Sequence, residues 1–110
     1  MAKIDLSKLK AAKPATKEHT ETIAGDRQTF TITALDGAAR LELLGLEGQG
    51  ELINRTRLAL VKGLGITPAE AEELIQADWE AALSIAGEVV MFTCSLQKAI
   101  ATEKAAAEKN

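Results

Sequence analysis

A single long stretch decides the fold. Residues 78–102 read DWEAALSIAGEVVMFTCSLQKAIAT, with no proline and one glycine. Apolar residues recur in it every three or four positions, which is the spacing of one face of an α-helix. A helix of 25 residues spans about 37 Å at 1.5 Å per residue. The stretch therefore predicts a long C-terminal helix that organises the rest of the chain.

The apolar residues of this predicted helix form two adjoining stripes. One stripe contains Trp79, Leu83, Ala86 and Val90. The other contains Ala82, Ile85, Val89, Phe92, Leu96 and Ile100. Two stripes make a face wider than one partner helix needs, so we expect it to serve both the core and a protein partner. The candidate protein-binding residues are Trp79, Leu83, Ala86, Val90, Phe92, Leu96 and Ile100.

Two residues interrupt the broad face of the helix. Glu88 is expected to point to solvent between the stripes. Gly87 lacks a side chain, so it would allow another helix to approach closely.

Ahead of the long helix, residues of about 19–35 have the pattern of a β-hairpin. Threonines alternate there with apolar residues, and Gly25-Asp26 is typical of a tight turn. Phe30, Ile32 and Ala34 would share the face that packs on helices, because successive side chains of a strand point to opposite sides. A lone hairpin is marginal in water and needs that support.

Three shorter helices are predicted between the hairpin and the long helix. Asp36 is expected to cap the first, and the second covers about residues 51–62 and ends at Gly63 and Gly65. Thr67-Pro68-Ala69-Glu70 combines an N-cap threonine, a proline at the first helical position and a glutamate at the third. This capping box predicts the start of the third helix, which runs to about Ala77.

The whole chain is predicted to hold one domain of mainly α class, since 110 residues with 46% hydrophobic content suit one modest core. We expect a flexible basic arm at 1–18, a globular domain at 19–102 and a frayed C-terminal tail at 103–110. In that domain the N-terminal β-hairpin packs on a small bundle of about four helices, the last of them long. An alternative for the arm is that Ser7 to Ala12 becomes helical on a partner.

The charge distribution disfavours nucleic acid as a partner. Residues 1–17 carry a net charge of +4 and the remainder −7, so the folded part would repel a phosphate backbone. The longest apolar run is interrupted by Glu88 and is shorter than the roughly 20 residues of a membrane span. One cysteine and no secretory signal pattern indicate a cytoplasmic protein.

The usual catalytic patterns are missing from the sequence. His19 is the only histidine, and Cys94 is interpreted as a buried, inert residue of the long helix. The acidic residues after Thr67 are interpreted as a solvated first turn that complements the helix dipole. We therefore expect no enzyme activity and no catalytic, cofactor-binding or metal-binding residues.

The order of elements resembles a known family. The hairpin ends Thr29-Phe-Thr-Ile-Thr-Ala-Leu, the next helix reads Asp36-Gly-Ala-Ala-Arg-Leu-Glu-Leu-Leu, and a tryptophan leads into the long helix. Over roughly residues 20–100 the chain resembles the tail assembly chaperones of long-tailed bacteriophages, the lambda-type G proteins. The resemblance implies a homo-oligomeric factor of the host cytoplasm that is absent from the mature virion. Such a factor holds the tape measure protein while the major tail protein polymerises around it.

The same family makes a longer product by a programmed ribosomal frameshift. The chain reads Glu108-Lys109-Asn110 at its end, and these residues are compatible with a slippery codon run. The chain is shorter than the lambda type. Two alternative functions remain open at this point: a structural virion component, such as a connector or tube-associated protein, and a small regulatory nucleic-acid binder that uses the lysine-rich arm.

Overall fold

The computed structural model describes the backbone of residues 14–108 and the side chains of residues 14–96 apart from Gln49. In this part of the chain a two-stranded hairpin precedes four α-helices, which confirms the predicted fold class. Most of the predicted flexible arm, together with its alternative of a partner-bound helix on Ser7 to Ala12, lies outside the described residues. The elements in chain order are β1 (Thr16–Ile23), β2 (Asp26–Thr33), α2 (Gly37–Leu44), the 3-10 turn η1 (Gln49–Glu51), α3 (Leu52–Leu64), α4 (Pro68–Ala77) and α5 (Trp79–Glu108).

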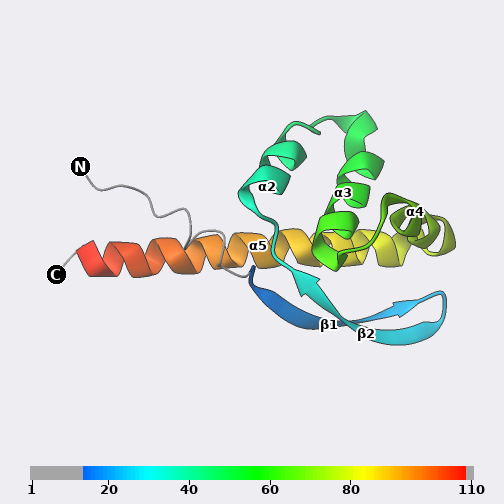
Figure 1. Cartoon of the computed structure of the whole chain (residues 1–110), viewed down its shortest axis with the longest axis horizontal. Helices are drawn as coiled ribbons and strands as arrows, with labels where there is room; N and C mark the ends of the chain where they lie inside the picture. Colours follow the sequence, from blue (N-terminus) through cyan, green and yellow to red (C-terminus); the bar gives the residue numbers. More distant parts are fainter. Residues whose placement is uncertain (1–13, 109–110) are drawn as a thin grey trace.

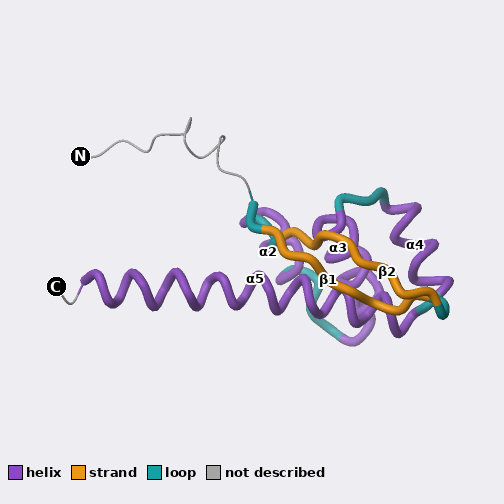
Figure 2. Tube along the Cα trace, turned by 90° about the horizontal axis from the view of Figure 1, so that it is seen from below, coloured by secondary structure: helices purple, strands orange, loops and turns teal. Residues whose placement is uncertain are grey.

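The long helix α5 is the axis of the molecule. Figure 1 shows the hairpin along one side of α5, α2 and α3 on the other side, and α4 beside its first turns. In the view from below, the hairpin runs along the same part of α5 that carries the other helices (Figure 2). The helix ends at Glu108, six residues beyond the predicted end at Thr102.

The hairpin is longer than predicted, and its turn lies one residue earlier. The strand β1 begins at Thr16, and Ile23 pairs with Asp26 across a turn formed by Ala24 and Gly25. Both turn residues have positive φ, 50° and 83°, as a type I′ turn requires. The predicted Gly25-Asp26 turn is therefore wrong, because Asp26 already belongs to β2. Phe30 and Ile32 do face the helices, as predicted.

Small residues let the helices pack closely. Gly63 of α3 lies against Val89 of α5, and a Cβ atom added to Gly63 would lie 2.5 Å from Val89 Cγ2. The prediction that Gly63 ends α3 is therefore wrong, since it is a packing residue inside the helix. Gly65 does end it, in the left-handed conformation with its N–H donating to the Val61 carbonyl at 3.0 Å.

The core consists of two adjoining clusters along α5. One joins α3 and α4 to α5 and contains Ala59, Leu60, Ala71, Ile75, Ala82, Ile85 and Ala86. The other joins the hairpin and the start of α2 to α5 and contains Ile32, Leu35, Ala39 and Val89. The hairpin and α3 therefore both pack along α5, and α3 also contacts β2.

Three side chains cap the helices as their types predict. Asp36 accepts from the Ala39 N–H at 2.8 Å, which starts α2. Thr67 and Glu70 form the predicted capping box of α4, with reciprocal hydrogen bonds of 3.1 and 3.0 Å. Asp78 accepts from the Ala81 N–H at 3.1 Å and so caps α5.

Polar contacts fasten the hairpin along α5. The second oxygen of Asp78 accepts from the N–H of Ala24 in the hairpin turn at 2.9 Å. Farther along, Ser84 donates to Glu21 at 2.9 Å. The remaining contact is an ion pair of 3.2 Å between Lys17 and Glu88. Glu88 thus pairs with the hairpin and does not simply point to solvent as predicted.

Candidate functional site

The most unusual surface feature is the apolar residues that the fold leaves exposed. Six large apolar side chains of the described part are at least a third exposed: Leu41, Leu44, Leu52, Ile53, Trp79 and Met91. They come from α2, the start of α3 and one side of α5. Single exposed apolar residues are ordinary, but a group on neighbouring elements is a candidate binding surface.

A groove of about 530 Å³ separates α2 from α3 above α5, and we call it the central groove. Leu83, Ala86, Gly87, Val90 and Met91 of α5 form its floor. Its walls and rim are Leu43, Leu44, Glu47, Leu52, Arg55, Thr56 and Ala59. No atom lies within 4 Å of the position of a Cβ on Gly87, so the floor is open there.

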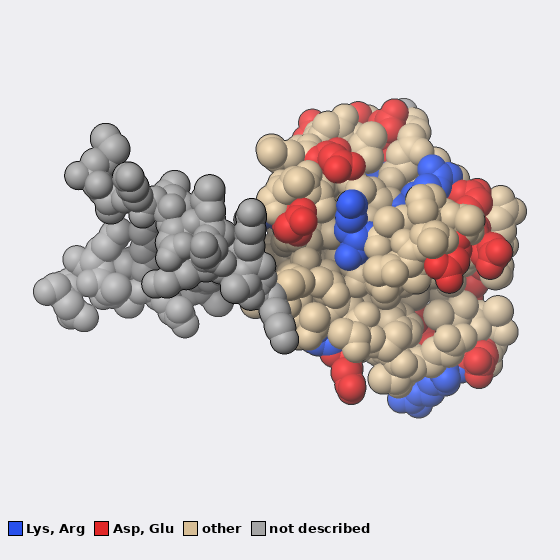
Figure 3. Space-filling model, viewed as in Figure 1, with Lys and Arg blue, Asp and Glu red and all other residues tan. Residues whose placement is uncertain are grey.

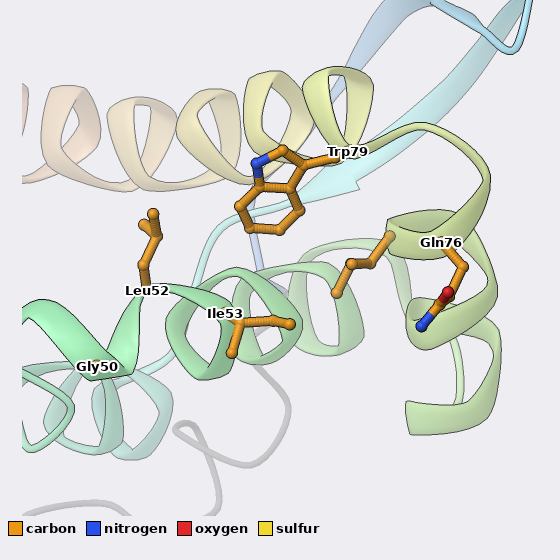
Figure 4. A pocket seen from close by; sticks show the side chains of 6 residues that line it. Gly50, Leu52, Ile53, Gln76 and Trp79 are labelled. Atoms are coloured by element: carbon orange, nitrogen blue, oxygen red, sulfur yellow. The ribbon is translucent and has the colours of Figure 1, made fainter.

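A second hollow of about 490 Å³ lies around Trp79, where α3, α4 and α5 meet. In Figure 4 the Trp79 indole reaches from the start of α5 over α3, Leu52 points up beside it, and Ile53 lies on α3 below it. Gln76 lies at the polar edge of this Trp79 hollow. Trp79 itself is 37% exposed, so a bound side chain could cover the indole without unfolding the helix.

A third hollow of about 580 Å³ lies between α2 and α5 on the side of α2 away from α3, and we call it the α2 hollow. Its lining is Leu35, Gly37, Arg40, Leu41, Leu43, Leu44, Val90, Thr93 and Cys94. Below it, the buried Thr93 hydroxyl accepts from the Leu35 N–H at 3.0 Å and donates to the Val89 carbonyl. The polar atoms under the hollow are therefore satisfied, and its surface is apolar.

The three hollows form one continuous surface. Leu52 lines both the Trp79 hollow and the central groove, and Val90 lines both the central groove and the α2 hollow. Helix α2 stands between the last two, attached through one buried residue, Ala39, and the half-buried Leu43. The surface therefore follows α5 and passes on both sides of α2.

The structure divides the seven predicted protein-binding residues between two sides of α5. Trp79, Leu83, Ala86 and Val90 line the hollows described above. Phe92 lies on the other side, against the hairpin cluster, with the Lys17 ammonium 5.5 Å from its ring centre. Leu96 is half-buried and lines none of the three hollows, and the side chain of Ile100 lies outside the described residues.

Sequence reasoning missed the contribution of α2 and α3 to this surface. Leu41 is 72% and Leu44 63% exposed, although both belong to an eight-residue helix. The signal was present, because Leu41, Leu43, Leu44 and Leu46 spread around more of a short helix than one apolar stripe covers. The interpretation of Cys94 as buried is wrong, since the thiol is exposed at the edge of the α2 hollow.

Charges around the surface are mainly acidic. Residues 14–96 hold thirteen acidic and six basic side chains, a net charge of −7. Figure 3 shows acidic side chains scattered over this face with few basic ones. Arg57 is engaged within the fold by Glu72 of α4, at 2.6 Å, and this bond holds the pKa of the Glu72 carboxyl below its ordinary value.

Among the described residues, His19 and Cys94 belong to different elements, the hairpin and α5. The His19 ring and the Glu21 carboxylate share a hydrogen bond of 2.9 Å on the hairpin. Cys94 lies on α5 at the edge of the α2 hollow. Among the residues searched, no group of three or more His, Cys, Asp or Glu could hold a metal ion. By length and composition Trp79–Leu96 resembles a membrane span, with a mean hydropathy of 1.2, but a third of it is buried in the fold.

No family model, no curated protein and no solved structure matches this chain.

Proposed function

We propose that the chain is a tail assembly chaperone that binds the tape measure protein of a long-tailed phage and acts without catalysis. The central groove is the observation that carries this proposal. Its floor of small and apolar residues and its two helical walls have the form that receives an amphipathic helix of a partner. The family resemblance names the partner, because tape measure proteins are long and rich in helix.

Gly87 sits where such a partner helix would come closest. Because nothing lies within 4 Å of a Cβ at this position, the backbone of α5 is open to direct contact. Leu83, Val90 and Met91 surround it with apolar side chains. Glu47 and Arg55 at the rim suit a helix whose apolar stripe is bordered by charges of either sign.

The experiment is co-expression with the tape measure protein of the same phage, followed by affinity capture. Gly87→Phe fills the groove floor and should weaken retention of the partner at least about tenfold, since the steric block removes the central contact. Ser95→Phe is the matched control, because Ser95 is exposed on the same helix and lines none of the hollows. It should retain the partner like the parent.

Two results would contradict the proposal. The first is a parent chain that retains no tape measure protein. The second is equal retention by Gly87→Phe and Ser95→Phe. The fluorescence of Trp79, the only tryptophan, gives an independent titration because its hollow adjoins the groove through Leu52. Self-association, which the proposal includes, is measured by light scattering over a range of concentrations.

A further inference from the structure

The α2 hollow is apolar and open, and it adjoins the central groove across α2, with Leu43, Leu44 and Val90 lining both. Leu41 and Leu44 expose most of their surface beside it, and Val90 and Thr93 of α5 form its floor. A hollow of about 580 Å³ has room for two or three aliphatic side chains. Some apolar group is expected to cover it, because exposed surface of this kind costs free energy in water.

The chain itself passes the edge of this hollow. The Ala15 carbonyl accepts from the Ala34 N–H at 2.9 Å, and the next residue, Leu35, lines the hollow. Pro14 therefore precedes a residue, Ala15, that is hydrogen-bonded to the neighbour of the rim residue Leu35. The segment that precedes it in sequence, residues 1–13, starts from this point.

The composition of residues 1–13 matches the hollow and its surroundings. The segment has three large aliphatic residues, Ile4, Leu6 and Leu9, and four lysines against one aspartate. Its net charge of +3 is opposite to the −7 of residues 14–96. Attraction between the two parts acts over about 8–10 Å at ordinary salt.

We propose that Leu6 and Leu9 of this arm pack in the α2 hollow of the same chain. Four residues lie between Leu9 and Pro14, and the five steps from one to the other span up to about 16 Å, which is enough to cross the rim. A tether this short gives an effective concentration in the millimolar range, so even weak apolar contacts keep the arm docked much of the time. Docking covers Leu41 and Cys94 and holds α2 against α5.

A second copy of the chain is the competing occupant of the hollow. Residues 14–96 of two copies each carry −7 and repel one another, whereas the arm is attracted and is always present at the tethered concentration. The arm is therefore favoured over a second copy. The inference goes beyond the proposed function, since it concerns a different hollow and needs no partner protein.

Cys94 makes the proposal testable without an added probe site. It is the only cysteine, and it is exposed at the edge of the hollow. The full chain is treated with a disulfide reagent that releases a coloured thiolate when it reacts with Cys94. The rate of Cys94 modification in the folded chain is then divided by the rate in the denatured chain. Leu6→Ser with Leu9→Ser should raise this ratio at least about fivefold, because the rate follows the fraction of molecules with the arm undocked.

The matched control is Ala11→Ser with Ala12→Ser, which changes the same arm without removing a large apolar side chain. Its rate should equal that of the parent. Raising the salt concentration should also speed the reaction of the parent, since screening weakens the charge attraction. Circular dichroism of each variant establishes that the fold is unchanged.

Two outcomes would overturn the proposal. One is an equal Cys94 rate in the parent and in the doubly substituted Leu6 and Leu9 variant. The other is a parent rate that falls as the protein concentration rises, which would show that a second copy covers the hollow. Failure of the arm to dock leaves capture of the tape measure protein by the central groove unaffected, so the two proposals are tested separately.

Discussion

The closest approach between two helices allows a quantitative test of the packing. A Cβ on Gly63 would lie 2.5 Å from Val89 Cγ2 and 2.7 Å from Cγ1. Carbon atoms in proteins do not pack at these distances. Val89 is fully buried and β-branched, so its side chain has no alternative rotamer that is free of cost. We therefore expect Gly63→Ala to destabilise the fold.

Two effects of opposite sign set the size of that change. Overpacking a tight core costs about 1–3 kcal/mol, and contacts this short belong at the upper end. Replacing glycine by alanine inside a helix stabilises it by about 1 kcal/mol. The free energy of unfolding should therefore fall by about 2 kcal/mol. For a domain of this size the Tm then falls by roughly 8–16 °C.

Gly87→Ala is the matched control for this prediction. Gly87 is also inside a helix, but a Cβ there meets nothing within 4 Å, so only the helix effect remains. This variant should be more stable than the parent by up to about 1 kcal/mol. Urea unfolding followed by circular dichroism measures both variants. If Gly63→Ala is as stable as Gly87→Ala, the tight contact with Val89 does not exist and the packing argument fails.

Two further predictions concern capping residues. Hydrogen bonds from the N–H groups of Ala24 and Ala81 hold the pKa of Asp78 below its ordinary value of about 4. The ionised carboxylate therefore stabilises the fold at neutral pH, and this stabilisation is lost as the pH falls through the lowered pKa. The advantage of the parent over Asp78→Asn in urea unfolding should shrink across that acid range, and a constant difference would contradict the assignment. Thr67→Ala should cost about 1 kcal/mol through loss of the α4 cap, whereas Thr67→Ser should cost little, as thermal unfolding would show.

Local signals in the sequence predicted the helix starts well. Asp36 and the Thr67 capping box act within four residues of themselves, so no tertiary information is needed to interpret them. The long helix was predicted from its periodicity and the absence of proline. The hairpin was also recognised, but its turn was misplaced because alanine rarely adopts positive φ and Ala24 does.

The errors at Gly63 and Cys94 have a tertiary origin. In the sequence Gly63 resembles a residue that ends a helix, and only the folded chain shows that it packs against Val89. Cys94 sits between apolar neighbours in sequence, but the hairpin and α3 cover only part of the circumference of α5. The central groove could not be predicted at all. It depends on the distance between α2 and α3, which the chain between them does not encode in any local pattern.

The polar contacts along α5 have a consequence for the order of events during translation. Ala24, Glu21 and Lys17 of the hairpin bond to Asp78, Ser84 and Glu88. Each partner follows at least 54 residues later in the chain. At synthesis rates of about 5–20 residues per second, the hairpin waits roughly three to eleven seconds for the first of them. During that interval Phe30 and Ile32 on the apolar side of β2 can be covered by α3 but not by Val89 of α5, so the nascent chain is most prone to aggregate before α5 emerges.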